Sequence, residues 1–557
     1  MKRVSAAAAA VLGLCLAGWA ALAVHAGQPG LARGATTKPV PVPRPDGNAG
    51  NEAAQQKFQA AFGEEAQKVS RTSSTDDDVA FAAKLLDGAQ KATDARDFQI
   101  VLCEKAIEFA ARSPAGYVTA KGASELLAAL VPERKDSARK KFLDVCERYC
   151  HIATAPKDKR TAASRFVDAL LCAAEEEMAS GDANDAVRLC QRAAPVAPGC
   201  GPHTEACVKF RLESAKAHQA AEKELAQLEA ALKANPKNSQ AAKRLVLLCV
   251  LDLDNPAKAA PHLAELAAEE ALKANVPLAA GDPGAADEDA CLKLRDWYRG
   301  LARTANGFAK VHALARSRTY AQRFLQLHTA KDDKTLLGDA ALFEIAQELM
   351  AAQAKMNGGW LDLLALPEDR YYLHDSFRTR PWKRTADGIL SGRDYQGITL
   401  LPYEPPAEYD YCATLSVMTE GGGAGLVCVS GGKAFSCILC GAAVRKGGLE
   451  MVNGRQAGSS STPPNPTDRD VPLAPGVRYS VLVQVRAKAV RVCLDGEPII
   501  ELPLTNGNAL TPMGYLPPGG RCLGIMTIRM PVAVHSLYVR EVTGTGRFAE
   551  YDGKAKP

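Results

Sequence analysis

YSVLVQVRAKAVRVCLDGEPIIELPL, residues 479–504, decides the fold of the C-terminal third of the chain. Valine occupies every second position over 481–485 and again at 490 and 492. Alternate side chains of a strand point to one face, so both runs predict strands with an apolar face. Asp495-Gly496 separates two apolar runs and favours the positive φ angles of a two-residue hairpin. The segment therefore predicts three antiparallel strands in a meander, with one face towards a core.

Further short apolar runs flank this segment on both sides. Glycine pairs and the dipeptide Asn453-Gly454 separate them. Many short strands joined by Gly-rich and Pro-rich turns are typical of a sandwich. We therefore expect an antiparallel jelly-roll β-sandwich over residues 380–546 and a tail over 547–557. Its strands are predicted near 388–391, 397–401, 410–418, 424–430, 433–440, 448–452, 478–486, 489–494, 498–502, 521–529 and 533–542.

Residues 52–355 show a helical period instead. DDDVAFAAKLLDGAQ, 76–90, has acidic residues in its first turn, which complement the helix dipole, and apolar residues three or four positions apart. ALKANP at 231–236 returns as ALKAN at 271–275. The spacing resembles tetratricopeptide-type helix hairpins, although it is longer than their standard of about 34 residues. Such hairpins stack into a solenoid, and a rise in Gly, Pro and aromatic residues predicts a junction over 356–379.

The N-terminus has the pattern of a Sec signal peptide over residues 1–26. Lys2 and Arg3 precede an apolar stretch, and AVHA at 23–26 offers small residues for cleavage after Ala26. A cut after Ala23 and an uncleaved anchor remain the alternatives. Residues 27–51 form a Pro-rich linker. The protein is therefore expected to be periplasmic or extracellular, with no membrane span apart from the leader.

Charge and motifs exclude several classes of function. The chain has 557 residues and a formal net charge of +5, from 68 Lys+Arg and 63 Asp+Glu. It shows no basic patch, so a nucleic-acid partner is not expected. Its nine histidines lack ligand spacing, and no HExxH, GxSxG, Walker or strand-linked GxGxxG motif occurs. We expect no cofactor and no metal, and we assign no catalytic residue.

Three stretches together resemble a known family of sandwiches. They are LPYEPPAEYDYCATLSV (401–417), YSVLVQVRAKAVRVCLDGEPII (479–500) and HSLYVREVTGTG (535–546). In this order they resemble the laminin-G-like or concanavalin A-like (lectin/glucanase) sandwich. In particular, they resemble the copy that follows a tetratricopeptide-like region in uncharacterised exported proteins of planctomycete-type bacteria. The resemblance implies a jelly roll with glycan or protein ligands and carries no catalytic residue set.

One carboxylate pair approaches the pattern of glucanases on this fold, E-x-D-x-x-E. Retaining glycosidases need two carboxyl groups about 5–5.5 Å apart. Glu408-Tyr409-Asp410 supplies the first two acids, but position 413 is Ala. We therefore expect a solvated strand edge here, and glycoside hydrolysis is the alternative function.

The sixteen cysteines raise questions of pairing and of metal binding. Cys190, Cys200, His203 and Cys207 lie within eighteen residues and contain the donor types of a zinc site, although their spacing fits no standard motif. A Cys200–Cys207 disulfide, free packed thiols and a metal site all remain open. Cys437 and Cys440 form a CxxC in a strand-like run, where the two side chains face opposite ways.

Aromatic residues gather in the junction and the sandwich. Sugar rings stack on exposed aromatic side chains, and polar groups at the rim then orient their hydroxyls. Trp382 and Tyr403 have an alternative role, in which they fill the contact between the helices and the sandwich. The candidate ligand-binding residues are Trp382, Tyr403, Tyr411, Arg491 and Tyr515. The loop 453–470 could line a ligand surface or be mobile.

These observations support a non-enzymatic, exported binding or scaffold protein. Its solenoid would bind a protein partner, and its sandwich would bind a glycan or protein ligand or cap the solenoid. A purely structural envelope protein is the third hypothesis.

Overall fold

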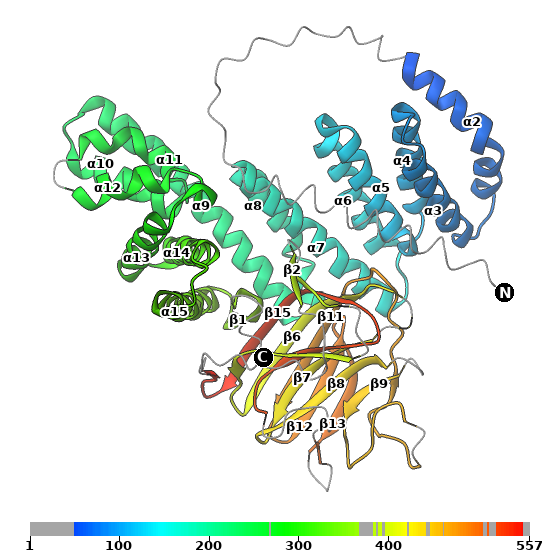
Figure 1. Cartoon of the computed structure of the whole chain (residues 1–557). Coiled ribbons are helices and arrows are strands. Elements are labelled where there is room, and N and C mark those ends of the chain that lie inside the picture. The colour runs from blue at the N-terminus through cyan, green and yellow to red at the C-terminus, as the bar shows by residue number, and fades with distance from the viewer. Residues whose placement is uncertain are drawn as a thin grey trace.

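The computed structural model describes residues 49–266, 269–366, 382–385, 388–392, 396–419, 421, 423–441, 446–459, 462–504, 509–511 and 520–549. Helices come first and antiparallel sheets follow (Figure 1), which confirms the predicted fold class. The predicted signal peptide and most of the linker lie outside the described residues. Among the helices described, we find none whose length and apolar character would let it cross a membrane.

The helices pack on one another in chain order, as Figure 1 shows. Their bounds are α2 Ala49–Ser70, α3 Asp76–Lys91, α4 Arg96–Ala110, α5 Tyr117–Leu130, α6 Lys135–Ile152, α7 Pro156–Ser180, α8 Ala183–Ala193, α9 Pro202–Ala234, α10 Ser239–Leu247, α11 Pro256–Ala259, α12 Glu270–Ala279, α13 Glu288–Thr304, α14 Gly307–Leu327 and α15 Asp333–Met356.

Local chemistry sets several helix ends. Asp182, Asn238, Asp287 and Asp332 each accept a hydrogen bond from the backbone N–H three residues later, at the starts of α8, α10, α13 and α15. These N-cap bonds satisfy amides that have no partner inside the helix. Gly181 ends α7 with φ 88°, a left-handed conformation that glycine adopts without steric cost.

Helix α9 joins two parts of the helical array. Val208 and Ala215 in its first half pack in an apolar cluster with α7 and α8. Leu225 and Leu232 in its second half belong to a separate cluster with α10 and the helices that follow. One 33-residue helix thus contributes to two cores.

The recurring ALKAN motif does not mark a structural repeat. Its first copy ends α9, where Asn235 is the C-cap. Its second copy lies inside α12, which continues past Asn275 to Ala279. The two copies occupy different positions in their helices, so the sequence repeat is not a repeat of hairpin geometry.

Two large sheets form the sandwich, and two further short strands pair in a separate sheet. Their strands are β1 Trp360–Asp362, β2 Lys383–Thr385, β3 Gly388–Leu390, β4 Gln396–Leu400, β5 Tyr403–Glu404, β6 Glu408–Val417, β7 Gly423–Ser430, β8 Lys433–Gly441, β9 Lys446–Glu450, β10 Arg469–Asp470, β11 Tyr479–Arg486, β12 Ala489–Leu494, β13 Glu497–Pro503, β14 Gly524–Ile528, β15 Val532–Thr543 and β16 Arg547–Phe548. The eight-stranded sheet runs β13-β12-β11-β6-β15-β3-β2, with β1 also paired to β15, and the six-stranded sheet runs β10-β9-β8-β7-β14-β4.

The meander predicted for residues 479–504 is confirmed. Val483 pairs with Val492, and Val492 pairs with Ile500, all antiparallel. Asp495 and Gly496 have φ angles of 49° and 78°, as the hairpin requires. The alternating valines of the segment are buried in the core between the sheets.

Two short strands lie outside the predicted sandwich range. β1 falls in the predicted junction yet pairs with β15. β16 falls in the predicted tail and pairs with β5. Strands of two or three residues show no detectable alternation, so the sequence pattern could not reveal them.

Candidate functional site

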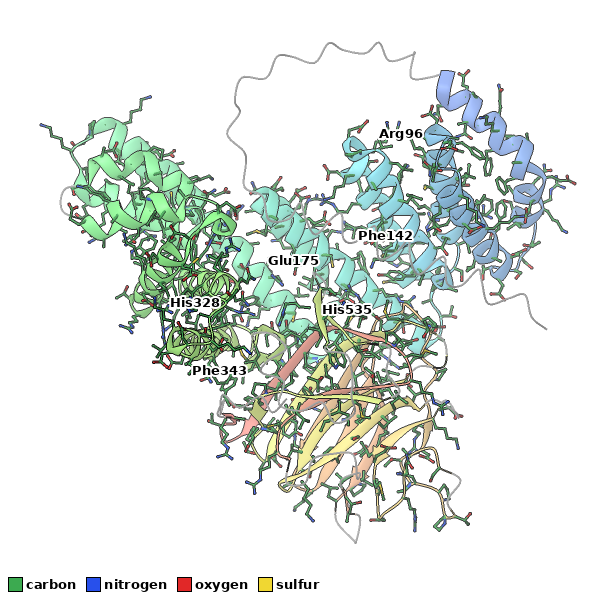
Figure 2. All side chains as sticks on the ribbon, in the orientation of Figure 1. Arg96, Phe142, Glu175, His328, Phe343 and His535 are labelled. Carbon is green, nitrogen blue, oxygen red and sulfur yellow. The ribbon has the colours of Figure 1, made fainter. Side chains whose placement is uncertain are left out.

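The eight-stranded sheet meets helices α7, α9 and α15 along a contact that we call the seam. Arg160 of α7 forms an ion pair with Glu497 of β13 at 2.8 Å. Phe343 of α15 packs edge-on against Phe548 of β16, in the two-stranded sheet, with ring centroids 6.1 Å apart. Figure 2 shows Phe343 on the helical side of this contact and His535 on the sandwich side. The sandwich is therefore packed on the helices rather than tethered by a linker.

A buried aromatic cluster lies in the seam. His203, near the start of α9, packs against Tyr538 of β15 with centroids 4.2 Å apart and against Trp360 of β1 at 5.1 Å. The Cys207 Sγ lies 3.2 Å from His203 Nε2. The Arg540 guanidinium stacks over the Trp360 ring at 4.9 Å, in cation–π geometry. The cluster joins the first turns of α9 to two strands of the sheet.

The Cys207–His203 pair is not an activated nucleophile. Burial lowers the pKa of His203 to about 4 and raises the pKa of Cys207 to about 12. Both groups are therefore neutral at pH 7, whereas a nucleophilic cysteine needs a thiolate. The contact contributes packing rather than reactivity.

For Cys200 and Cys207 a disulfide, free packed thiols and a metal site were the alternatives, and in the structure both thiols are free. Cys200 Sγ donates to Val196 O at 3.6 Å, while Cys207 faces His203. The two side chains have different partners, and of the alternatives the structure favours packed free thiols. Within the described part of the chain, no group of three or more His, Cys, Asp or Glu side chains has metal-binding geometry.

A charge network lies beside the aromatic cluster. The Asp410 side chain has no exposed surface and accepts hydrogen bonds from Arg486 at 2.6 Å and from Arg540 at 2.5 Å. Gln484 Nε2 also donates to Asp410 at 3.2 Å. Arg540 thus contacts both Asp410 and Trp360, and it couples the network to the aromatic cluster.

These contacts decide how the acids of β6 are used. Asp410 is neutralised by two guanidiniums, and Glu408 Oε1 accepts a hydrogen bond from Ala487 N. A retaining glycosidase needs a pair of carboxyl groups that face the substrate. Glu408 and Asp410 serve as structural acceptors instead, so this segment does not form the hydrolase pattern.

The aromatic ligand candidates occupy the core instead of a binding surface. Tyr411 is fully buried and donates to Gly524 O, on the opposite sheet, at 2.9 Å. Tyr403 is buried and donates to Glu541 at 2.7 Å. Trp382 is 5% exposed and packs in the same apolar cluster. Their assignment as sugar-stacking residues is therefore wrong, because their ring faces are covered by protein.

The other two candidates have different outcomes. Arg491 is exposed on β12, and it lies opposite Gln484 of β11 and Glu501 of β13. No observation tests its role as a ligand-binding residue. Tyr515 lies outside the described residues.

The polar loop at 453–470 is anchored where the structure describes it. Asn465 is 2% exposed and donates to Leu449 O at 2.9 Å and to Arg455 O at 2.7 Å. Thr467 Oγ1 donates to Asn465 Oδ1 and accepts from Leu449 N. These bonds hold the segment against β9.

The seam contains a cavity of about 290 Å³, which we call the seam cavity. It lies between α14 and α15 on one side and β1, β2, β3 and β15 on the other. Sites for small molecules typically occupy about 300–1,000 Å³, so this cavity is at the lower end of the range. The described residues that line it are Arg318, Leu349, Gln353, Asp362, Leu364, Ala365, Arg384, Thr385, Gly388, His535, Ser536 and Tyr538.

Positive charge exceeds negative charge among these residues. The lining includes the guanidiniums of Arg318 and Arg384 but, of the described residues, only one carboxyl, that of Asp362. Burial raises the pKa of Asp362, which disfavours its negative charge. Arg384 Nη2 donates to Leu364 O at 2.9 Å and to Leu366 O at 3.0 Å. These bonds orient Arg384 before any ligand arrives.

Sequence reasoning did not identify the lining residues. They come from two helices, four strands and a short 3-10 turn spread over more than two hundred residues. None of them belongs to a spaced motif. The sequence did show that aromatic residues are enriched in the junction. One of them, Trp360, lies in the seam, but it does not line the cavity.

Comparisons with known proteins address only the sandwich. No protein-family model matches the chain, and no curated protein matches it either. Among solved structures, it is similar to the carbohydrate-binding module CBM66 from Bacillus subtilis, with 10% identity and a TM-score of 0.22, over 33% of this chain and 96% of that one.

Two further solved structures show the same level of similarity. A Bacillus subtilis protein of unknown function with a galectin-like fold is 14% identical, with a TM-score of 0.21, over 29% of this chain and 86% of that one. A putative glycosyl hydrolase from Parabacteroides distasonis is 12% identical, with a TM-score of 0.22, over 34% and 90%. At these values the similarity concerns the sandwich fold and carries no functional argument.

Proposed function

We propose that the protein is an exported, non-enzymatic binding protein whose sandwich and solenoid together hold a glycan ligand in the seam cavity. The observation that carries this proposal is the convergence of polar side chains from both halves on one cavity. Gln353 comes from α15, Arg384 from β2 and Ser536 from β15. Polyhydroxylated ligands are recognised by such sets of convergent polar groups beside apolar walls.

We propose that the helical region binds a protein partner. Helical solenoids present extended surfaces that commonly bind other chains. Leu336 and Leu337, at the start of α15, are 57% and 69% exposed. Exposed apolar surface can mark a protein contact, and we place the contact at these two leucines.

A glycoside hydrolase is the second candidate. The feature in its favour is Asp362, whose raised pKa suits a general acid. Hydrolysis needs a second carboxyl group across the scissile bond. Among the described residues that line the cavity, Asp362 is the only carboxylate, and this favours binding without bond cleavage.

A glycan array with the full chain tests the proposal, beside a pull-down from envelope extracts. We expect glycan binding that is weakened by Arg384→Gln and unchanged by Arg547→Gln, a variant of a 69% exposed arginine paired with Glu404. We also expect pull-down of a protein partner that Leu337→Ser reduces. Absence of binding in both assays would overturn the proposed binding function. Release of a sugar product from a bound glycan would establish the hydrolase instead.

A further inference from the structure

We propose that a second cavity, in the helical region, binds a fatty acid, with Lys310 and Lys355 on its carboxylate and the acyl chain on an apolar floor. Helices α13, α14 and α15 pack side by side (Figure 1). The cavity measures about 360 Å³ and lies between the turn from α13 to α14 and the last turns of α15; we call it the helical cavity. The described residues that line it include none that line the seam cavity, so this site goes beyond the proposed glycan site.

The floor of the helical cavity is apolar. Ala352 is 9% exposed and belongs to the apolar cluster formed by α10 and the helices that follow. Ala305 and Met356 also line the cavity, are half-buried, and pack against the same cluster. None of these side chains offers a strong hydrogen-bonding group, so the floor suits a hydrocarbon chain better than a polar ligand.

Unpaired positive charge lies at the rim of the helical cavity. Lys310 and Lys355 line it, and within the described part of the chain neither ammonium forms an ion pair or a hydrogen bond. Glu348 is the one carboxyl among the described lining residues, and Arg299 Nη2 already pairs with its Oε1 at 2.6 Å. Two cationic groups therefore remain available, and charge complementarity selects a ligand with an anionic end.

Packing holds this rim in place. Phe308, in the first turn of α14, packs against Phe210 of α9, with ring centroids 5.4 Å apart. Gly307 begins α14 and also lines the cavity, so the positive end of the helix dipole adds to the charge of the two lysines. The cationic rim and the apolar floor are therefore both present before a ligand arrives.

An acyl chain suits the helical cavity better than the end of a peptide. A peptide would place backbone amides against the floor, where the apolar side chains offer them no partners. The cavity volume of about 360 Å³ is near the lower limit for small-molecule sites, which favours an acid of medium length. An uncharged apolar ligand would leave both ammoniums unpaired, and a small anion would leave the floor uncovered. A fatty acid satisfies both parts of the site.

Ligand-observed NMR titration of the full chain with matched probes tests the inference. The probes are octanoate, its neutral counterpart octanamide, butyrate as a short acid, and an acetylated trileucine with a free carboxylate as the alternative occupant. We expect octanoate to bind at least about tenfold more tightly than octanamide, with an affinity that falls as salt increases. Each methylene added between butyrate and octanoate should tighten binding about three- to fourfold.

Two lysine double variants form a matched pair. Lys310→Gln with Lys355→Gln should remove the preference for octanoate over octanamide. Lys331→Gln with Lys334→Gln changes the net charge equally, at two exposed lysines near the opposite end of α15, and should retain the preference.

A third variant tests the apolar part of the site. Ala351 is exposed and lines the cavity, so Ala351→Trp should fill the space without changing the melting temperature. It should weaken octanoate and octanamide alike, by severalfold.

Four results would overturn the inference. Equal affinity of the wild-type chain for octanoate and octanamide would remove the role of the two lysines. Octanoate binding that neither the Lys310 and Lys355 double variant nor Ala351→Trp affects would place the ligand elsewhere. Binding of the peptide in place of octanoate would exclude a fatty acid as the occupant, and absence of binding by every probe would exclude the site. The proposed glycan function is decided separately, by the glycan array.

Discussion

Acidification should weaken the seam through His203. Its buried imidazole is held neutral, because burial lowers its pKa from the ordinary value of 6.5 to about 4. Between these two values the unfolded or opened state binds a proton that the closed state does not. Stability therefore rises with pH across this window, and it is lost as the pH falls from 6.5 towards 4.

The magnitude follows from the size of the shift. Each pKa unit corresponds to about 1.4 kcal/mol, so the complete shift removes about 3 kcal/mol once the pH is below 4. At pH 5 the loss relative to pH 7 is about 2 kcal/mol. The groups that face the imidazole are Cys207, Trp360 and Tyr538, and none of them is a carboxylate that could compensate an imidazolium charge.

Hydrogen exchange followed by mass spectrometry measures this local opening. Peptides from the start of α9 and from β1 should exchange faster at pH 5 than at pH 7, after correction for the intrinsic rate. His203→Gln keeps a polar side chain beside Cys207 but cannot be protonated, so its seam peptides should lose the pH dependence. His151→Gln, at an exposed histidine of α6, is the matched control and should behave like wild type. An equal pH dependence in His203→Gln and wild type would refute the reasoning.

Four further predictions follow from single contacts. Asp410→Asn should lower the stability of the sandwich by about 2–3 kcal/mol. This is less than the usual cost of breaking a buried ion pair, because Arg486 and Arg540 are each about one-third exposed. Calorimetry measures the loss, and a change under about 0.5 kcal/mol would contradict the prediction. Tyr411→Phe should cost about 1–2 kcal/mol, because it removes a buried hydrogen bond between the two sheets; chemical denaturation tests this, and unchanged stability would argue against the bond. Asn465→Ala should increase proteolysis of the 453–470 loop without changing the helical region, and equal cleavage of both proteins would count against its anchoring role. Hydrogen bonds to the carboxylates of Asp332 and Glu288 raise the pKa of His328. The protonated imidazole should therefore stabilise the contact of α13 with the start of α15 below about pH 6.5, and this stabilisation should be lost as the pH rises through the folded pKa. Hydrogen exchange at the starts of α13 and α15 should accelerate over that rise, and His328→Gln should remove this pH dependence.

The strands of the sandwich could be predicted because each core strand has two distinct faces. Alternation over Val481–Val485 and the Asp495-Gly496 turn needs no information from distant residues, and it led to the correct meander. Helix periodicity was equally informative over residues 52–355. The ALKAN motif indicated a structural repeat that the structure does not contain. The same five residues end one helix and lie inside another, and only the surrounding packing distinguishes the two positions.

Side-chain roles in the sandwich were harder to predict, since alternation does not say which face is the core. Tyr409 and Tyr411 share a face with Ala413 and point into the core between the two sheets. Asp410, between them, points to the opposite face of its sheet and is buried there under its two arginines. An aromatic residue on such a strand is consistent with both a binding surface and a core until the pairing of sheets is known. Burial of Tyr411 and pairing of its hydroxyl with the opposite sheet settle the matter for this strand.

The seam explains why the candidate site escaped sequence reasoning and why it is specific to this arrangement of domains. Neither half alone encloses the cavity, because Gln353 comes from the last helix and Ser536 from a strand near the C-terminus. The same contact that brings them together also buries His203 against Trp360 and Tyr538. A perturbation that opens the aromatic cluster should therefore separate the two walls of the cavity. Ligand binding and seam stability are then linked, and a ligand that bridges the walls should slow hydrogen exchange at the start of α9 without contacting it.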